Sequence, residues 1–232
     1  ERVILGGSNL IDRYWYGKVW YFENATEINK EKSFVATKTD STVRDAVFLQ
    51  DDKFILAQDG GIIQILNVLK PPEIWDVAIQ CVGFACQHDD NITSLAAFES
   101  KTHFVTAGMD CCLKVWQTST LLAQCSYPVA HADVITGVDV LSKNDSLFVS
   151  SSMDSEATIW DVRKGNPAKR LYKIDCNIGF TTVCWNSMRE HEVAIGGEDG
   201  VVYLVDTRKP DELVAKSPAF PRPIHRLKYN NN

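Results

Sequence analysis

Short runs of apolar residues, each about five residues long, alternate with polar turns along the whole chain, and the pattern contains no long amphipathic helix. Gly-rich, Asp-Gly and Ser-rich turns separate these runs, so the pattern predicts short β-strands that pair with their neighbours in sequence. One motif recurs, in which an Asp is followed six residues later by a Trp or its substitute, often with another Asp next. The motif occurs at Asp110 with Trp116, at Asp154 with Trp160-Asp161, and at Asp199 with Val205-Asp206.

The three motifs lie about 44 residues apart, which is typical of WD repeats, whose strands build the blades of a β-propeller. We therefore predict an all-β WD-repeat β-propeller and treat residues 1–232 as a single domain. The predicted units are a partial blade 1 (about 1–24), blade 2 (about 41–69), blade 3 (about 88–120), blade 4 (about 131–162), blade 5 (about 177–207) and the beginning of blade 6 (about 222). We expect a closed propeller of about seven blades. About five blades and a fragment are visible, so we expect the remainder to lie outside this sequence.

Matching polar residues accompany the motif in the third and fourth units. A His precedes the turn Asp by about 22 residues, and a hydroxyl residue precedes it by four. In WD repeats these groups form a buried hydrogen-bond chain, which fixes the turn when every member is satisfied. We assign to this structural frame, and not to catalysis, His88, Thr106, Asp110 and Trp116; His131, Ser150, Asp154 and Trp160; and Asp199.

The first unit contains the least regular segment. The pattern predicts two paired strands at 3–10 and 18–22, joined by a turn at 11–17. This turn carries Arg13, Tyr14, Trp15 and Tyr16. Because Tyr, Trp and Arg are enriched at the energetic centres of protein interfaces, we take these four residues as candidate partner-binding residues. The alternative, in which Trp15 fills the core between blades, stays open at this point.

Composition and charge narrow the function classes. The chain is 45% hydrophobic with a formal net charge of −6, which argues against nucleic-acid binding and leaves room for a basic protein partner. No apolar run approaches about 18 residues, so no membrane span is predicted. The odd number of cysteines, seven, includes several in strand-like apolar runs, which indicates buried thiols in a reducing compartment. We expect a cytoplasmic protein, with the nucleus as a second compartment.

The motifs that carry chemistry are missing from the chain. No phosphate-binding Gly-Lys-Ser/Thr loop, dinucleotide fingerprint, Gly-x-Ser-x-Gly elbow or His-Glu-x-x-His zinc motif occurs. The cysteines lack the paired spacing of a zinc site, and the five histidines are scattered. We therefore predict no catalytic residue, no cofactor and no metal.

Several segments resemble a known family. The first unit reads Leu5-Gly6-Gly7-Ser8-Asn9-Leu10 and then Arg13-x-Trp15-x-Gly17-x-x-Trp20-x-Phe22; the third reads Gln87-His88-Asp89-Asp90 and then Asp110-x-Cys112-Leu113-Lys114-Val115-Trp116. The later units contribute Ala130-His131-Ala132 and Gly200-x-Val202-x-Leu204-Val205-Asp206-Thr207. Taken in order, these segments resemble the methylosome WD-repeat subunit across nearly the whole chain. We interpret the chain as a divergent member, with the insect form as a candidate.

The resemblance implies a non-catalytic scaffold. Members of that family bind the N-terminal domain of a type II protein arginine methyltransferase and help to present basic Arg/Gly-rich substrates such as Sm proteins or histones. By the match of motifs, Trp15 would insert into the enzyme with Arg13 beside it. Tyr14 and Tyr16 depart from the smaller residues that the family pattern has there.

Two alternative functions remain open. The segment Trp160-Asp161-Val162-Arg163 resembles the Trp-Asp-x-Arg box with which some propellers, as substrate receptors of cullin-type ubiquitin ligases, dock on their adaptor. A third interpretation keeps the propeller but makes it a tether for a Tudor-domain protein. No residue of the chain decides between the third interpretation and the others.

Overall fold

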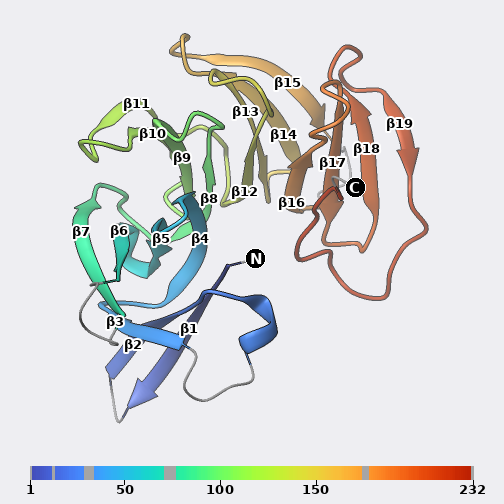
Figure 1. The fold of residues 1–232 in the computed structure, drawn as a ribbon. Coiled ribbons are helices and arrows are strands. Elements are labelled where there is room, and N and C mark those ends of the chain that lie inside the picture. The colour runs from blue at the N-terminus through green and yellow to red at the C-terminus, as the bar shows by residue number, and fades with distance from the viewer. Residues whose placement is uncertain (1, 12–13, 29–33, 71–76, 174–177, 231–232) are drawn as a thin grey trace. The chain divides into compact units, whose positions relative to one another are not determined.

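The structure is a computed structural model, and it describes residues 2–11, 14–28, 34–70, 77–173 and 178–230. Within these ranges nineteen strands form five antiparallel sheets, accompanied by two short 3-10 turns (Ala25–Glu27 and Asp59–Gly61) and no α-helix (Figure 1). The predicted all-β fold is therefore confirmed. The chain divides into two compact units, Glu1–Ile92 and Thr93–Asn232, and each is described by itself.

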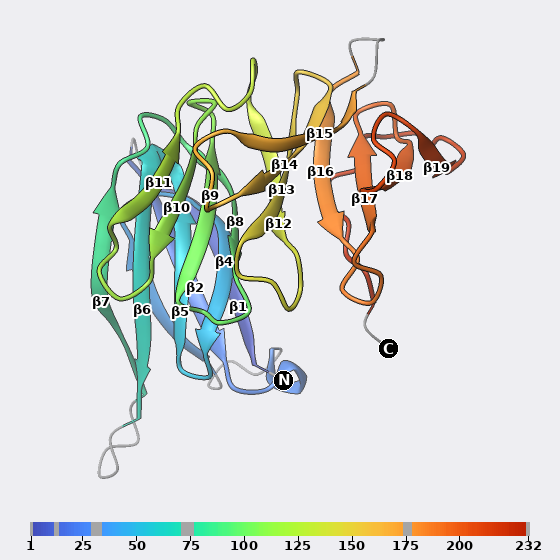
Figure 2. The ribbon, with the colours of Figure 1, turned by 90° about the horizontal axis from the view of Figure 1, so that it is seen from above.

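The first unit holds two sheets. The three-stranded sheet has the order β1-β2-β3 and comprises β1 (Val3–Ile11), β2 (Tyr14–Phe22) and β3 (Phe34–Thr39). The four-stranded sheet comprises β4 (Val43–Gln50), β5 (Lys53–Gln58), β6 (Ile62–Leu69) and β7 (Ala78–Cys86), which lie side by side in chain order (Figure 2). Tyr21 of β2 stacks on Phe54 of β5 with 6.4 Å between ring centroids, so the two sheets share an apolar core.

The second unit holds three four-stranded sheets, each in chain order from its first to its fourth strand. They comprise β8 (Ile92–Ala97), β9 (His103–Gly108), β10 (Leu113–Gln117) and β11 (Ala123–Tyr127); β12 (Ile135–Val140), β13 (Leu147–Ser152), β14 (Glu156–Asp161) and β15 (Pro167–Lys173); and β16 (Phe180–Trp185), β17 (Glu192–Gly197), β18 (Val202–Asp206) and β19 (Leu213–Lys216). In every four-stranded sheet of the chain the second strand is buried on both faces after its first residue. Burial on both faces is what stacking of sheet against sheet produces.

Threonine hydroxyls join successive sheets of the second unit. Thr93 on β8 donates to the carbonyl of Ile135 on β12 at 2.5 Å, and Thr136 on β12 donates to the carbonyl of Phe180 on β16 at 2.6 Å. Thr181 makes the same bond to the carbonyl of Ile224. Residues 218–230, which include the predicted beginning of blade 6, form no strand, but Ile224 accepts the bond that a first strand accepts elsewhere.

Each fourth strand carries a β-bulge at an equivalent place. The pairing register shifts in β7, β11, β15 and β19 opposite the position that Trp116 and Trp160 occupy in their sheets. The extra residues are Val82, Gln124, Ala168 and Val214. Such bulges increase local twist and expose the extra side chain, which becomes important for β7 below.

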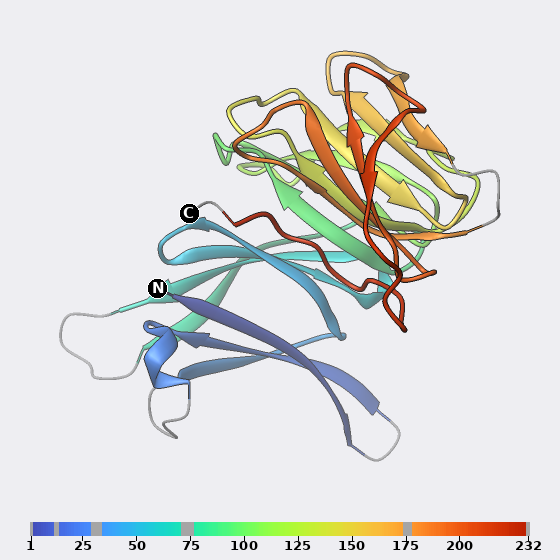
Figure 3. The ribbon, with the colours of Figure 1, turned by 90° about the vertical axis from the view of Figure 1, so that its right-hand side faces the viewer.

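The first hairpin corrects the sequence analysis. The predicted turn at 11–17 is too long, because β1 extends to Ile11 and β2 begins at Tyr14 (Figure 3, dark blue). Trp15 is paired with Leu10 and Tyr16 with Asn9, so residues 14–17 belong to a strand. Aromatic residues favour strands because they pack on a pleated surface, and this preference extends β2 back to Tyr14. Gly17 is required there, since a Cβ would lie 2.1 Å from the carbonyl oxygen of Ser41.

Candidate functional site

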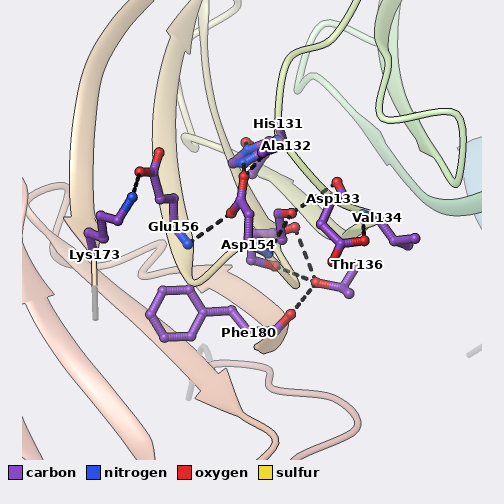
Figure 4. Close-up of polar contacts among 12 residues, drawn as sticks. His131, Ala132, Asp133, Val134, Thr136, Asp154, Glu156, Lys173 and Phe180 are labelled. Carbon is purple, nitrogen blue, oxygen red and sulfur yellow. Dashed lines mark hydrogen bonds and ion pairs between the residues drawn. The ribbon is translucent and has the colours of Figure 1, made fainter. Parts of the chain in front are cut away.

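A buried hydrogen-bond chain runs through the sheet β12–β15. The indole of Trp160 donates to Ser150 Oγ at 2.7 Å, and Ser150 Oγ lies 2.7 Å from His131 Nε2. His131 Nδ1 lies 2.9 Å from the carboxylate of Asp154 (Figure 4). With the imidazole proton on Nδ1, every link has one donor and one acceptor. The structure thus brings together all four residues that the sequence analysis assigned to this frame.

The electrostatics of Asp154 suit a structural anchor. Burial would raise the pKa of Asp154, but hydrogen bonds from His131, Ala132 N–H and Glu156 N–H together hold it below its usual range. The Ala132 and Glu156 amides lie 2.9 Å from its oxygens, so the carboxylate fixes both the turn before β14 and the segment before β12 (Figure 4). An anion held by several N–H groups is satisfied and has no proton to exchange near neutral pH.

Ser, His and Asp, the residue types of Ser150, His131 and Asp154, also form the catalytic triad of serine hydrolases, so a catalytic role for these three residues has to be considered. The burial of Ser150 argues against it: the residue has no exposed surface, and its Oγ already accepts a bond from Trp160. A substrate carbonyl could not reach that oxygen. The set therefore holds the sheet together and does not attack a substrate.

The neighbouring sheet β8–β11 contains part of the same hydrogen-bond chain. Trp116 donates to Thr106 Oγ1 at 2.8 Å, and Asp110 accepts from the Cys112 N–H at 3.1 Å, which shapes the β9–β10 turn. Trp116 also stacks on Phe104, with 6.0 Å between centroids. His88, which the sequence analysis placed in the same set, is buried and belongs to the first unit.

The sheet β16–β19 uses a different partner for its turn Asp. Asp199 accepts a bond of 2.5 Å from the hydroxyl of Tyr203 and another from the Val201 N–H. The position of the Trp is occupied by Val205, which is fully buried. Sequence reasoning missed Tyr203; its only signal was a Tyr two residues before the Trp position.

An Asp-x-Arg clasp closes the third strand of two sheets. The guanidinium of Arg163 forks onto Asp161 with bonds of 2.8 and 2.7 Å, and the Arg163 N–H binds the same carboxylate. Arg208 makes the equivalent fork onto Asp206. The Arg163 side-chain bond, backbone bond and charge lower the pKa of Asp161 to about 2, although burial opposes them. The Trp-Asp-x-Arg pattern thus has a local structural use, whatever else Arg163 does.

The candidate partner-binding residues lie on the first hairpin. Arg13 lies outside the described residues. Tyr14 and Trp15 are placed as strand residues of β2, but their side chains are not described. Tyr16 is half-buried, and the Lys38 ammonium from β3 lies 5.2 Å from its ring centroid, within the range of a cation–π contact. The assignment of Arg13, Tyr14, Trp15 and Tyr16 as partner-binding residues stays a prediction.

One surface pocket of about 530 Å³ lies beside the turns after β16 and β18. Its lining residues are Met188, Arg189, Glu190, His191, Glu192, Asp206, Arg208 and Val214. Both arginines pair with lining carboxylates, Arg189 with Glu192 and Arg208 with Asp206, so neither offers an uncompensated positive charge to an anionic ligand. Among the residues with described positions, no group of three or more His, Cys, Asp and Glu could hold a metal. Within the residues that the structure describes, no helix is long and apolar enough to cross a membrane.

Comparisons with known proteins agree with this architecture. The family described as WD domain, G-beta repeat matches residues 79–117 and 123–161. The first match begins in β7 and ends with β10, and the second runs from β11 to the end of β14. A repeat in the sequence therefore contains the fourth strand of one sheet and the first three strands of the next.

Curated relatives are similar over most of the chain. Methylosome protein WDR77 of Xenopus laevis is 28% identical over 211 residues, which are 90% of this chain and 62% of the relative. Protein valois of Drosophila melanogaster is 22% identical over 216 residues, which are 87% of this chain and 58% of the relative. Transducin beta-like protein 3 of Mus musculus is 32% identical over 124 residues, 52% of this chain and 14% of that protein. The chain thus spans 62% and 58% of the first two relatives. Its sheets, its two matched repeats and these similarities together show an all-β fold of WD-repeat type that is similar to the methylosome WD-repeat subunit.

Proposed function

We propose that this chain is a non-catalytic adaptor of a protein arginine methyltransferase complex. It binds the N-terminal domain of the type II enzyme and helps to present basic Arg/Gly-rich substrates such as Sm proteins or histones. The similarity to Methylosome protein WDR77 over 90% of the chain is the observation that carries the proposal. Cytoplasm and nucleus are the compartments that go with this function.

The use of polar groups in the second unit supports an adaptor. Ser150, His131 and Asp154 satisfy one another inside a sheet, and Arg163 and Arg208 are bound to their own carboxylates. Residues so engaged stabilise a rigid scaffold. A rigid scaffold lowers the entropy cost of association, since its binding surface needs no ordering when a partner arrives.

The charge balance supports the choice of substrate. The net charge of −6 favours association with basic tails over association with nucleic acid. Such steering acts on the association rate and weakens as salt is added. We therefore expect the adaptor to lower the KM of the enzyme for a basic Arg/Gly-rich peptide, and to do so less at high salt.

Replacement of Trp15 tests the proposal. In the full-length protein, Trp15→Ala should abolish co-purification with the purified methyltransferase while the protein stays folded by circular dichroism. A large aromatic anchor at an interface contributes about 2–4 kcal/mol or more, a loss of roughly 30-fold or more in affinity. Phe220→Ala is the matched control, because Phe220 is an exposed aromatic residue in the second unit.

Two results would contradict the proposal at different levels. Failure of the wild-type protein to bind the enzyme would overturn the adaptor function. Normal binding of the Trp15→Ala protein would leave the function standing and show that Trp15 does not anchor the enzyme.

A further inference from the structure

The fourth strand of the second sheet, β7, has an unusual outer edge. It is nine residues long, Ala78–Cys86, and contains neither a charged residue nor a proline. It pairs with β6 on one side, and no other strand of the described chain pairs with its second edge. Two large apolar side chains are exposed on it, Val82 at 49% and Phe84 at 72%.

The other outer strands are protected in ways that β7 is not. β15 carries a proline and three basic residues, and β19 is four residues long and ends in Lys216. β3 has six residues and includes Lys38, and β11 has only five. Short length, charge and proline are the devices that stop a sheet edge from pairing with another chain. The bulge does not set β7 apart, because β11, β15 and β19 have the same bulge.

The chemistry of this edge defines what would occupy it. The N–H and C=O groups on this edge, which no other described strand pairs with, match the backbone of an extended strand, which adds to a sheet by main-chain hydrogen bonds. The exposed Val82 and Phe84 would cover apolar side chains at alternate positions of that strand. Since β7 carries no charge, it offers no counter-charge to a basic tail, and an apolar segment of a folded partner fits better.

The position of β7 connects it to the first hairpin. Within the first unit, β3 pairs with β2, the strand that carries Trp15, and β3 also lies against β7 (Figure 1). β3 therefore lies between β2 and β7 in this unit, so a partner bound at the first hairpin is two strands away from β7.

We propose that the methyltransferase contributes an extended apolar segment that pairs with β7 as a fifth strand of this sheet. This inference rests on the proposed function, since it adds a second contact to the same partner. The pairing gives hydrogen-bond partners to backbone groups on the free edge of β7 and covers Val82 and Phe84.

Matched valine variants test the pairing. The affinity of the purified enzyme is measured for full-length wild-type protein and for Val82→Lys, Phe84→Lys and Val214→Lys. Val82 and Val214 are both the extra residue of a bulge in a fourth strand, exposed 49% and 61%. We expect Val82→Lys and Phe84→Lys each to weaken binding by about tenfold or more, and Val214→Lys to leave it unchanged.

Hydrogen exchange of the wild-type protein separates strand pairing from a simple apolar contact. Backbone amides of β7 should exchange more slowly in the complex than in the free protein, because a fifth strand gives them acceptors. This readout needs no variant to fold. Absence of added protection overturns the strand pairing even if the lysine variants bind weakly.

The outcomes distinguish this inference from the function on which it rests. If the wild-type protein does not bind the enzyme, the proposed function fails and the inference fails with it. If wild type, Val82→Lys and Phe84→Lys bind equally, the adaptor function stands and the inference is wrong. Equal weakening by Val214→Lys would show a general effect of added charge and would also overturn it.

Discussion

The sheet β12–β15 and the hairpin β1–β2 place their tryptophans in different settings. In β12–β15, Trp160 is buried, donates to Ser150 and packs against the rings of Phe148 and Tyr127. In the hairpin, Trp15 stands near the start of β2, outside the repeated Asp-Trp pattern, opposite Leu10. The regular tryptophan has its polar and apolar surfaces already occupied, so it is unavailable to a partner. Residues that leave the repeat are therefore the better candidates for recognition.

The largest expected difference between these two regions is in the stability lost when each tryptophan is replaced. Trp160→Ala removes a buried ring from an aromatic cluster and leaves Ser150 without its donor. We expect the free energy of unfolding to fall by about 3–5 kcal/mol, measured by denaturant unfolding of the full-length protein. Trp15→Ala is expected to change it by about 1 kcal/mol or less. Equal losses at the two sites would contradict the distinction between frame and interface.

Removing the Ser150 hydroxyl, which lies in the middle of the hydrogen-bond chain of β12–β15, should cause the next largest loss of stability. Ser150→Ala leaves His131 Nε2 and the Trp160 indole N–H without a partner in a buried site. Each unsatisfied buried group costs about 1–3 kcal/mol, so we expect a loss of about 2–4 kcal/mol in the free energy of unfolding. The control is Ser126→Ala, at an exposed serine that accepts a bond from Lys114. If Ser150→Ala lowered the free energy of unfolding no more than Ser126→Ala, the buried hydrogen-bond chain would contribute nothing to stability.

The contrast between regular and irregular parts also explains how much the sequence could predict. The first three strands of each four-stranded sheet follow the apolar runs, and the Asp and Trp positions mark their turns. The fourth strands were not predicted. β15 contains Pro167, Lys169, Arg170 and Lys173, and β7 has exposed residues on both faces, so neither shows the alternation of a half-buried strand. An edge strand pairs with only one neighbouring strand. Its residues contact solvent as much as the core, so they need not be apolar at alternate positions.

The frame residues were predictable where one sheet supplies them all. Ser150 on β13 and Trp160 on β14 lie on paired strands, and His131 and Asp154 lie in the segments just before β12 and β14, so one sheet fixes the spacing of all four. Tyr203 was not predictable in this way, because its bond to Asp199 depends on a neighbouring glycine. A Cβ at Gly197 would lie 2.3 Å from Asp199 Oδ1 and 3.2 Å from the Tyr203 ring. That requirement is a matter of space between strands and leaves no periodic signal.

The Asp-x-Arg clasp gives the smallest expected effect on stability. Arg163 belongs to the repeated pattern, yet its side chain is 70% exposed, so it combines a residue of the regular frame with a surface that a partner could reach. It holds the pKa of Asp161 at about 2, below the ordinary value of about 4. The folded pKa is lowered, so this stabilisation is complete above about pH 4 and is lost as the pH falls through about 2. Arg163→Ala should therefore lower stability slightly at neutral pH and flatten the acid limb of the stability profile, measured by thermal unfolding from pH 2 to 7.

Arg208→Ala is the matched control, since Arg208 makes the same fork onto Asp206. If both arginines serve only the sheet, the two variants should show similar small losses and bind the methyltransferase normally. Loss of a ubiquitin-ligase adaptor from Arg163→Ala alone, with the methyltransferase still bound, would show that a regular residue can also recognise a partner. That result would favour the ligase-receptor function, because the exposed guanidinium would then exchange its own Asp161 for an acceptor on the adaptor.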